Sequence, residues 1–187
     1  MVAWGDKDVR MSRVWAMPNS DTFDIPPIRQ LVQSHMFGVS VDPYARNKRW
    51  ATHTNDLNPD TQAEHHMDAT DFLVMLAMEG VQADVVLIDP PYSPRQVKEC
   101  YDSIGHKMKQ GDALLGAVRK KLKAAIMGII KPGGVVLHFG WNTVGMGKGL
   151  GFEIEEILLV CHGSDHNDTI CMVERRLAAL KSAGGNK

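Results

Sequence analysis

Cysteine is scarce in this sequence, and its scarcity indicates the kind of cellular compartment in which the protein works. The 187 residues include only Cys100, Cys161 and Cys171. An odd number of scattered cysteines, with no Cys-x-x-Cys pair, provides no disulfide framework and is typical of free thiols in a reducing compartment. We therefore expect a cytoplasmic protein.

Long hydrophobic runs are also missing. No apolar stretch approaches the roughly 18 residues that are needed to span a bilayer. Residues 1–8 lack the apolar core of a secretory signal. These two features predict a protein with no membrane partner.

Sets of metal ligands are likewise absent. His65 and His66 are adjacent in the chain, so their side chains point in different directions. Cys161, His162 and His166 share one segment, but no further ligand completes them at the usual spacing. We expect no metal site.

The sequence does contain alternating strand-like and helix-like segments, which predict an α/β fold with a mostly parallel sheet. Its length and the lack of a linker predict a single domain over residues 1–187, without a separate target-recognition domain. The expected strands are 39–41, 51–54, 85–88 and 135–139, followed by an antiparallel C-terminal hairpin of 154–160 and 169–173. The expected helices are 28–34, 69–78, 114–130 and 175–183, and residues 1–14 are expected to be loosely ordered.

The most informative motif is Asp89-Pro90-Pro91-Tyr92, which directly follows the apolar run 85–88. A buried strand that ends in these residues presents a rigid, exposed edge. The Asp89 carboxylate can accept a hydrogen bond, and so can the Pro90 carbonyl. The aromatic ring of Tyr92 offers a flat face. This combination suits recognition of the exocyclic amino group of a planar base.

The motif resembles the Asp-Pro-Pro-Tyr sequence of amino-methyltransferases that use S-adenosylmethionine, above all the DNA adenine-N6 enzymes. The likeness covers about residues 15–174 and is closest to small phage and prophage adenine methylases, with Asn55-Asp56-Leu57-Asn58-Pro59 and Phe139-Gly140-Trp141-Asn142 also matching. It implies a Rossmann-like S-adenosylmethionine-dependent methyltransferase fold, S-adenosylmethionine as cofactor and DNA as partner. For a phage-encoded protein, it implies the cytoplasm of the bacterial host.

Acidic residues mark the expected cofactor side of the sheet. Asp42 follows the first expected strand, Asp56 follows the second, and Asp68 precedes the next helix. Ligands of open α/β sheets bind at the carboxyl ends of the strands, and an acid after the second strand normally takes the ribose hydroxyls. These positions predict a nucleotide-like cofactor beside Asp42 and Asp56.

The resemblance assigns further cofactor contacts. Asp42-Pro43-Tyr44-Ala45 is similar to the Asp-Pro-Phe-Ala start of the cofactor motif of amino-methyltransferases. Thr22 and Phe23 lie in a segment similar to the one that these enzymes place against the methionine end of the cofactor. Asp68-Ala69 matches the acid near the cofactor adenine. The usual glycines after this cofactor motif are replaced by Arg46 and Asn47, so the loop either takes another path or binds the cofactor less tightly.

Basic residues gather after the catalytic motif. Residues 92–131 carry nine cations and three acids, a net charge of +6 in a chain whose total is −1. Such a segment suits a phosphate backbone. The candidate DNA contacts are Arg95, Lys98, Lys107 and Lys109; the cluster 119–123 ranks lower, because its helix can equally cover the far side of the sheet.

A glycine-rich stretch at 145–151 lacks the glycine at position 142 and the hydroxyl at position 149 that a phosphate-binding loop of the Walker type requires. We interpret this stretch as a mobile loop above the site, with Lys148 as another candidate DNA contact. A chain of this length offers little surface to grip and open a duplex alone, which makes a homodimer a candidate assembly.

The predicted function is methyl transfer from S-adenosylmethionine to adenine N6 in DNA, with the base flipped into the Asp89–Tyr92 pocket. The alternatives are N4-cytosine methylation in DNA, amino-methylation of RNA, or a catalytically silent nucleic-acid-binding protein of the same fold. N4 enzymes more often carry serine at the position of Asp89, which favours adenine. The missing glycines motivate the silent alternative.

Overall fold

The computed structural model describes residues 9–91, 105, 115–163 and 166–178. The strands are β1 (Arg10–Trp15), β2 (Ser40–Asp42), β3 (His53–Thr54), β4 (Ala83–Ile88), β5 (Ile130–Gly140), β6 (Phe152–Cys161) and β7 (Thr169–Arg176). The α-helices are α1 (Pro26–His35), α2 (Ala69–Met78) and α4 (Leu115–Ile129), and the short 3-10 helices are η1 (Thr22–Asp24) and η2 (Lys148–Leu150).

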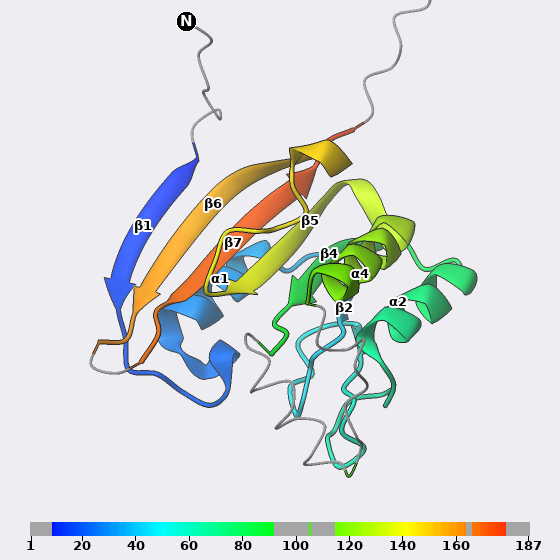
Figure 1. The fold of residues 1–187 in the computed structure, drawn as a ribbon, viewed down its shortest axis with the longest axis horizontal. Coiled ribbons are helices and arrows are strands. Elements are labelled where there is room, and N and C mark those ends of the chain that lie inside the picture. The colour runs from blue at the N-terminus through cyan, green and yellow to red at the C-terminus, as the bar shows by residue number, and fades with distance from the viewer. Residues whose placement is uncertain (1–8, 92–104, 106–114, 164–165, 179–187) are drawn as a thin grey trace, which may run out of the picture.

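The strands form one seven-stranded sheet in the order β1-β6-β7-β5-β4-β2-β3 (Figure 1). Every neighbouring pair is parallel except the two that contain β7. The structure therefore confirms the predicted mostly parallel sheet with an antiparallel C-terminal hairpin, formed by β6 and β7. After β2 the chain adds β3 on one side and then crosses to β4 on the other side. The strand order thus reverses at β2 and β4, and open sheets bind ligands at such a switch point.

The central strand β4 explains why helices cover both faces of the sheet. Val85, Val86 and Leu87 are completely buried, since a parallel strand between two others needs an apolar side chain on each face. On one face, Val85 and Leu87 join a core cluster with Ile28 and Val32 of α1. Burial of each such side chain contributes about 1.5–3 kcal/mol.

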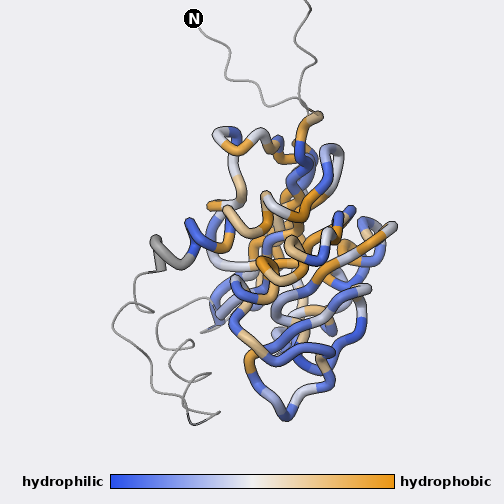
Figure 2. Tube along the Cα trace, turned by 90° about the vertical axis from the view of Figure 1, so that its right-hand side faces the viewer, coloured by the Kyte–Doolittle hydropathy of each residue, from blue (hydrophilic) through white to orange (hydrophobic). Residues whose placement is uncertain are grey.

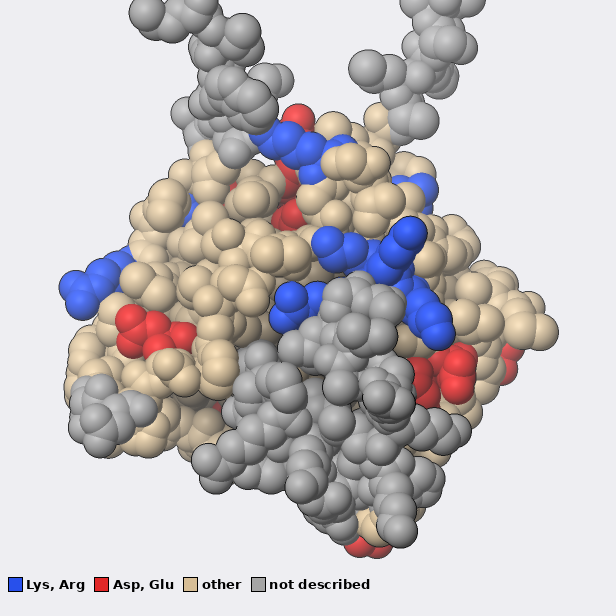
Figure 3. Space-filling model, viewed as in Figure 1, with Lys and Arg blue, Asp and Glu red and all other residues tan. Residues whose placement is uncertain are grey.

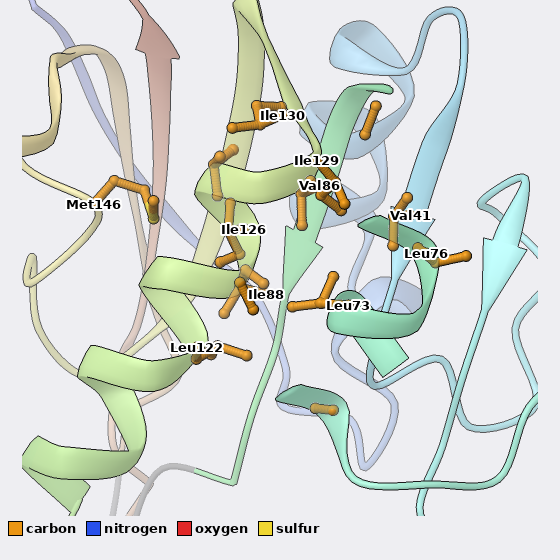
Figure 4. Close-up of a cluster of buried hydrophobic side chains, with 14 of the residues drawn as sticks. Val41, Leu73, Leu76, Val86, Ile88, Leu122, Ile126, Ile129, Ile130 and Met146 are labelled. Atoms are coloured by element: carbon orange, nitrogen blue, oxygen red, sulfur yellow. The ribbon is translucent and has the colours of Figure 1, made fainter. Parts of the chain in front are cut away.

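On the opposite face, α2 and α4 pack side by side over the sheet. Val86 and Ile88 of β4 contact this second cluster, which includes Leu73 of α2 together with Leu122 and Ile126 of α4 (Figure 4). Apolar residues accordingly fill the middle of the molecule, while the loops at its lower end, which include residues 43–68, are mostly hydrophilic (Figure 2). The carboxyl ends of β2 and β4 point toward these loops.

Two sequence-based expectations about secondary structure were wrong. Residues 10–15 form strand β1 at the sheet edge, where the expected loose order is replaced by parallel pairing with β6. The edge strand is mostly exposed, so it lacks the apolar pattern that would have revealed it. The expected helix 175–183 is contradicted at its start, because Arg175 and Arg176 continue β7. Its last five residues lie outside the described residues.

Candidate functional site

The switch point brings acids from different strands together. Asp42 is the last residue of β2, and Asp89 directly follows the end of β4. Val41 pairs with Val86, so the two strands end at neighbouring positions of the same edge. Asp89 and Asp56 both raise the pKa of Asp42 by charge repulsion, which places both carboxyls within electrostatic reach of Asp42.

Asp42 is the most unusual group at this edge. Its side chain is fully buried; Oδ1 accepts the Tyr44 N–H at 2.9 Å, whereas Oδ2 has no hydrogen-bond partner in the described structure. Burial raises the pKa of Asp42 to about 8, the Tyr44 N–H partly opposes that rise, and the charges of Asp89 and Asp56 add to it. A buried polar atom without a partner is costly, so this carboxyl suits a ligand that donates hydrogen bonds or carries positive charge.

Asn55 holds the loops around Asp42 in place, and sequence analysis missed this role. Its buried side chain donates to the carbonyl oxygens of Pro43 at 3.1 Å and Met67 at 3.0 Å, and it accepts the Met67 N–H at 3.1 Å. Its backbone N–H donates to the Asp42 carbonyl. The sequence marks Asn55 only as part of a stretch that resembles other methylases, because an isolated polar residue gives no signal that it will be buried.

The loop after β2 keeps a glycine-like path without a glycine. Arg46 has a φ of 50°, in the left-handed region that glycine adopts most readily. In this conformation the Arg46 N–H donates to Asp56 Oδ2 at 3.1 Å, while Asp56 Oδ1 accepts the Asn58 N–H at 2.9 Å. Of the two outcomes that the missing glycines left open, the left-handed turn at Arg46 favours an unchanged path.

The segment 22–24 borders the same loop. Phe23 is buried and packs edge-on against Phe139, with ring centroids 4.9 Å apart, and the Trp50 ring centroid lies 6.2 Å from that of Phe23. Phe23 is therefore part of the hydrophobic core. Thr22 is half-buried next to it.

Asp68 and Ala69 begin α2. Asp68 Oδ1 accepts the N–H groups of Thr70 at 2.8 Å and Asp71 at 3.3 Å, so this carboxylate is the N-cap of the helix. Its side chain is exposed, and Ala69 packs into the core. Asp68 thus has a structural role that does not depend on a cofactor.

The predicted catalytic motif is described only in part. Asp89, Pro90 and Pro91 are half-buried at the end of β4. The predicted catalytic residue Tyr92 and the predicted DNA contacts Arg95, Lys98, Lys107 and Lys109 lie outside the described residues. Their roles remain predictions.

The expected position of Lys148 above the site was wrong. Lys148 is exposed in η2, four residues before Phe152, and Phe152 pairs with Arg176 at the end of the sheet where β5 begins. Since β6 runs parallel to β5, the chain must travel back along the sheet after Gly140 before β6 can start. This return places Lys148 at the edge opposite Asp89 (Figure 1).

The same return segment is anchored on Glu174, a second residue that sequence analysis missed. The buried Glu174 carboxylate accepts the N–H groups of Met146 at 2.6 Å and Gly147 at 2.9 Å, and His138 Nε2 lies 3.0 Å away. Burial acts to raise the pKa of Glu174, but the His138 ring and the two N–H groups outweigh it and hold the pKa below its usual range. The only sequence signal for this role is that a single acid, Glu174, directly follows the expected strand 169–173.

Two absences can be stated for the part of the chain that the structure describes. No group of three or more His, Cys, Asp or Glu side chains there could hold a metal ion. In the same residues, no helix is both long and apolar enough to cross a membrane.

Comparison with solved structures identifies the fold. SMU.776, described as a methyltransferase and crystallised with SAH, matches with a TM-score of 0.54 and 13% identity over 78% of this chain and 48% of its own. TrmN from Thermus thermophilus matches with a TM-score of 0.51 and 14% identity over 82% of this chain and 49% of its own. The hypothetical protein TTHA0928, also from Thermus thermophilus, matches with a TM-score of 0.50 and 14% identity over 86% of this chain and 91% of its own.

The chain therefore has the Rossmann-like fold of S-adenosylmethionine-dependent methyltransferases. It spans about half the length of SMU.776 and of TrmN. No protein-family model and no curated protein matches the sequence.

Proposed function

We propose that this protein transfers a methyl group from S-adenosylmethionine to the N6 amino group of adenine in DNA. The observation that carries this proposal is the pair of acids at the switch point. Asp42, buried with an unpartnered oxygen, ends β2, and the Asp89-Pro90-Pro91 segment follows the neighbouring strand β4. The first suits a cofactor with a positive charge, and the second suits an amino group.

The residues around Asp42 fit S-adenosylmethionine. The cofactor carries an ammonium group and a sulfonium group, so a buried carboxylate with a free oxygen is a suitable partner for it. Asp56 would hold the ribose, Asp68 and Ala69 would border the adenine ring, and Thr22, Pro43 and Tyr44 would line the remaining part. When bound, the cofactor supplies an activated methyl group on its sulfonium.

Asp89 and Pro90 would act on the amino group that receives the methyl. Adenine N6 is a poor nucleophile because its lone pair is delocalised into the ring. The Asp89 carboxylate and the Pro90 carbonyl would each accept a hydrogen bond from an N6 N–H. These bonds would hold the nitrogen in line with the methyl group and favour its pyramidal form. This contribution is positioning and electrostatic stabilisation, with no covalent intermediate.

Tyr92 would stack on the target base, which must leave the duplex to reach Asp89. After methyl transfer the cationic N6 releases its extra proton to solvent, so Asp89 need not act as a full base. An aspartate at position 89 favours adenine over N4 of cytosine, where serine is more common.

The conformation of Arg46 weakens the argument for a catalytically silent protein of the same fold. The substitution of the usual glycine suggested a cofactor loop that no longer binds, but the left-handed φ of 50° is the conformation that a glycine would have provided. The RNA alternative remains a competing substrate class and is distinguished by experiment.

Cofactor titration by calorimetry and methylation of plasmid DNA, followed by sequencing that detects modified bases, test the proposal together. We expect S-adenosylmethionine to bind and N6-methyladenine to appear at a defined target. Binding without any methylated adenine, or methylation only of RNA or of cytosine N4, would overturn the proposed substrate. Absence of cofactor binding would support the silent fold.

A further inference from the structure

We propose that the basic face at the start of helix α4, formed by Arg119, Lys120 and Lys121, binds the phosphate backbone of duplex DNA beside the catalytic edge. This inference rests on the proposed function for the identity of the polyanion. The sequence alone gave these residues a low rank as DNA contacts, because it could not show toward which edge of the sheet this end of the helix is directed.

The position of α4 places the basic face next to Asp89. The helix ends at Ile129, directly before β5, whose first residue Ile130 pairs with Ala83 at the start of β4. Toward the other end of α4, Leu122 joins the core cluster that contains Ile88, the residue before Asp89. Figure 4 shows Leu122 and Ile88 at one end of this cluster and Ile130 and Val86 at the other.

The cations therefore lie even nearer to the catalytic edge than Leu122 does. Arg119 precedes Leu122 by about one helical turn, and a helix rises about 1.5 Å per residue. The side chains of Arg119, Lys120 and Lys121 are exposed. Figure 3 shows Lys and Arg side chains gathered over α4 on this face of the molecule.

The charge of α4 is not balanced by acids on the helix itself. The helix Leu115–Ile129 carries four cations, the fourth being Lys123, and no acid. Lys123 Nζ approaches the Met146 carbonyl oxygen at 3.4 Å. Among the described residues, none of Arg119, Lys120 and Lys121 forms an ion pair with an acid.

A helix face that is merely solvated usually mixes both signs of charge, because acids three or four residues from a cation stabilise the helix. Neighbouring cations repel each other. Binding to a row of phosphates relieves that repulsion and releases counterions from the nucleic acid. DNA fits better than an anionic membrane, because the three cations lie beside the candidate catalytic edge that would receive the base.

The test compares two doubly neutralised variants of equal charge. Lys120→Gln with Lys121→Gln changes the proposed surface, and Arg10→Gln with Arg13→Gln makes the same charge change on exposed positions of edge strand β1. Binding of a duplex oligonucleotide is measured by fluorescence anisotropy from 50 to 200 mM salt. Thermal unfolding checks the fold, and calorimetry with S-adenosylmethionine measures the cofactor site separately.

We expect the α4 variant to lower the slope of log affinity against log salt by about two units, one for each lost phosphate contact, so that roughly tenfold less affinity is lost across this salt range. The β1 variant should keep the wild-type slope. Equal slopes in all three proteins, or an equal decrease of the slope in both variants, would overturn the proposed surface. A decrease of the slope seen only with RNA or with anionic vesicles would also overturn it. A protein that binds DNA through α4 but never binds the cofactor would overturn only the proposed function.

Discussion

The guanidinium of Arg46 lies 2.7 Å from the Asp21 carboxylate and donates to the Ser20 carbonyl oxygen at 2.7 Å. The backbone N–H of the same residue donates to Asp56. Lys48, two residues further along, lies 2.6 Å from Asp24. Arg46, which stands where the resembled cofactor motif has glycine, therefore links the segment before α1 to the loop after β2, and both segments border the candidate cofactor site.

Variants of Arg46 separate its backbone conformation from its ion pair. Arg46→Ala and Arg46→Gly both remove the contact with Asp21, but only glycine adopts a φ of 50° without strain. We expect Arg46→Gly to be more stable than Arg46→Ala by about 1 kcal/mol in urea unfolding. Equal stability, or a more stable alanine variant, would show that the left-handed turn is not retained.

Asp42 should make the stability of the free protein depend on pH. Its pKa is about 8 in the fold against 3.8 in the unfolded chain. Between these values the folded state holds a proton that the unfolded state has released, so stability falls as pH rises from about 4 to 8 and then levels off. Asp42→Asn should flatten this dependence in unfolding measurements at pH 5–8.

The exposed Asp60 provides the control for this experiment, since Asp60→Asn removes a carboxylate of the same kind at the surface. That variant should keep the wild-type slope. The same titration links cofactor binding to pH, because a positively charged ligand favours the ionised form of Asp42. The affinity for S-adenosylmethionine should therefore rise with pH toward 8, and an affinity independent of pH would remove Asp42 from the cofactor site.

The sequence predicted the sheet class because the strands at 85–88 and 135–139 are buried on both faces. Such strands are recognised as continuous apolar runs and do not need alternating apolar and polar residues. It predicted Asp42 and Asp89 at one edge because parallel strands share their carboxyl ends. It failed at β1, where pairing with β6 rather than burial forms the strand. It also failed at Asn55, Glu174 and Lys148, whose roles depend on the route of the chain between strands.

Glu174 should stabilise the return segment and contribute to loss of stability in acid. Its folded pKa lies below its unfolded value of 4.5, so its stabilising effect is present above about pH 4.5 and is lost as pH falls further. Glu174→Gln should lower the unfolding free energy at pH 7 by about 1–3 kcal/mol, because it removes a charged acceptor from the buried Met146 N–H and the half-buried Gly147 N–H. Its stability should also vary less with pH below 4.5.

Glu153→Gln is the matched control, since Glu153 is exposed on the neighbouring strand β6. This variant should unfold like the wild type at neutral pH. If both glutamate variants lost the same stability, the effect would come from net charge and not from the anchor at Met146 and Gly147.

The last prediction concerns the chemical step. Asp89→Ala should abolish detectable methyl transfer while leaving the fold and most of the affinity for S-adenosylmethionine, because in the proposed mechanism Asp89 would hold the amino group and Asp42 would face the cofactor. Asp89→Asn should retain little activity, since a neutral amide oxygen replaces a charged acceptor; removal of one preorganised polar group of this kind typically costs about 10²–10³ in kcat. Tyr92→Phe should remain active, whereas Tyr92→Ala should weaken binding of the base by about 1–3 kcal/mol, since stacking requires the ring and not the hydroxyl. Single-turnover methylation with a saturating cofactor separates the two effects, with the rate of methyl transfer reporting on Asp89 and DNA affinity on Tyr92. A fully active Asp89→Ala enzyme would contradict the mechanism at its central residue, whatever the cofactor site then proved to bind.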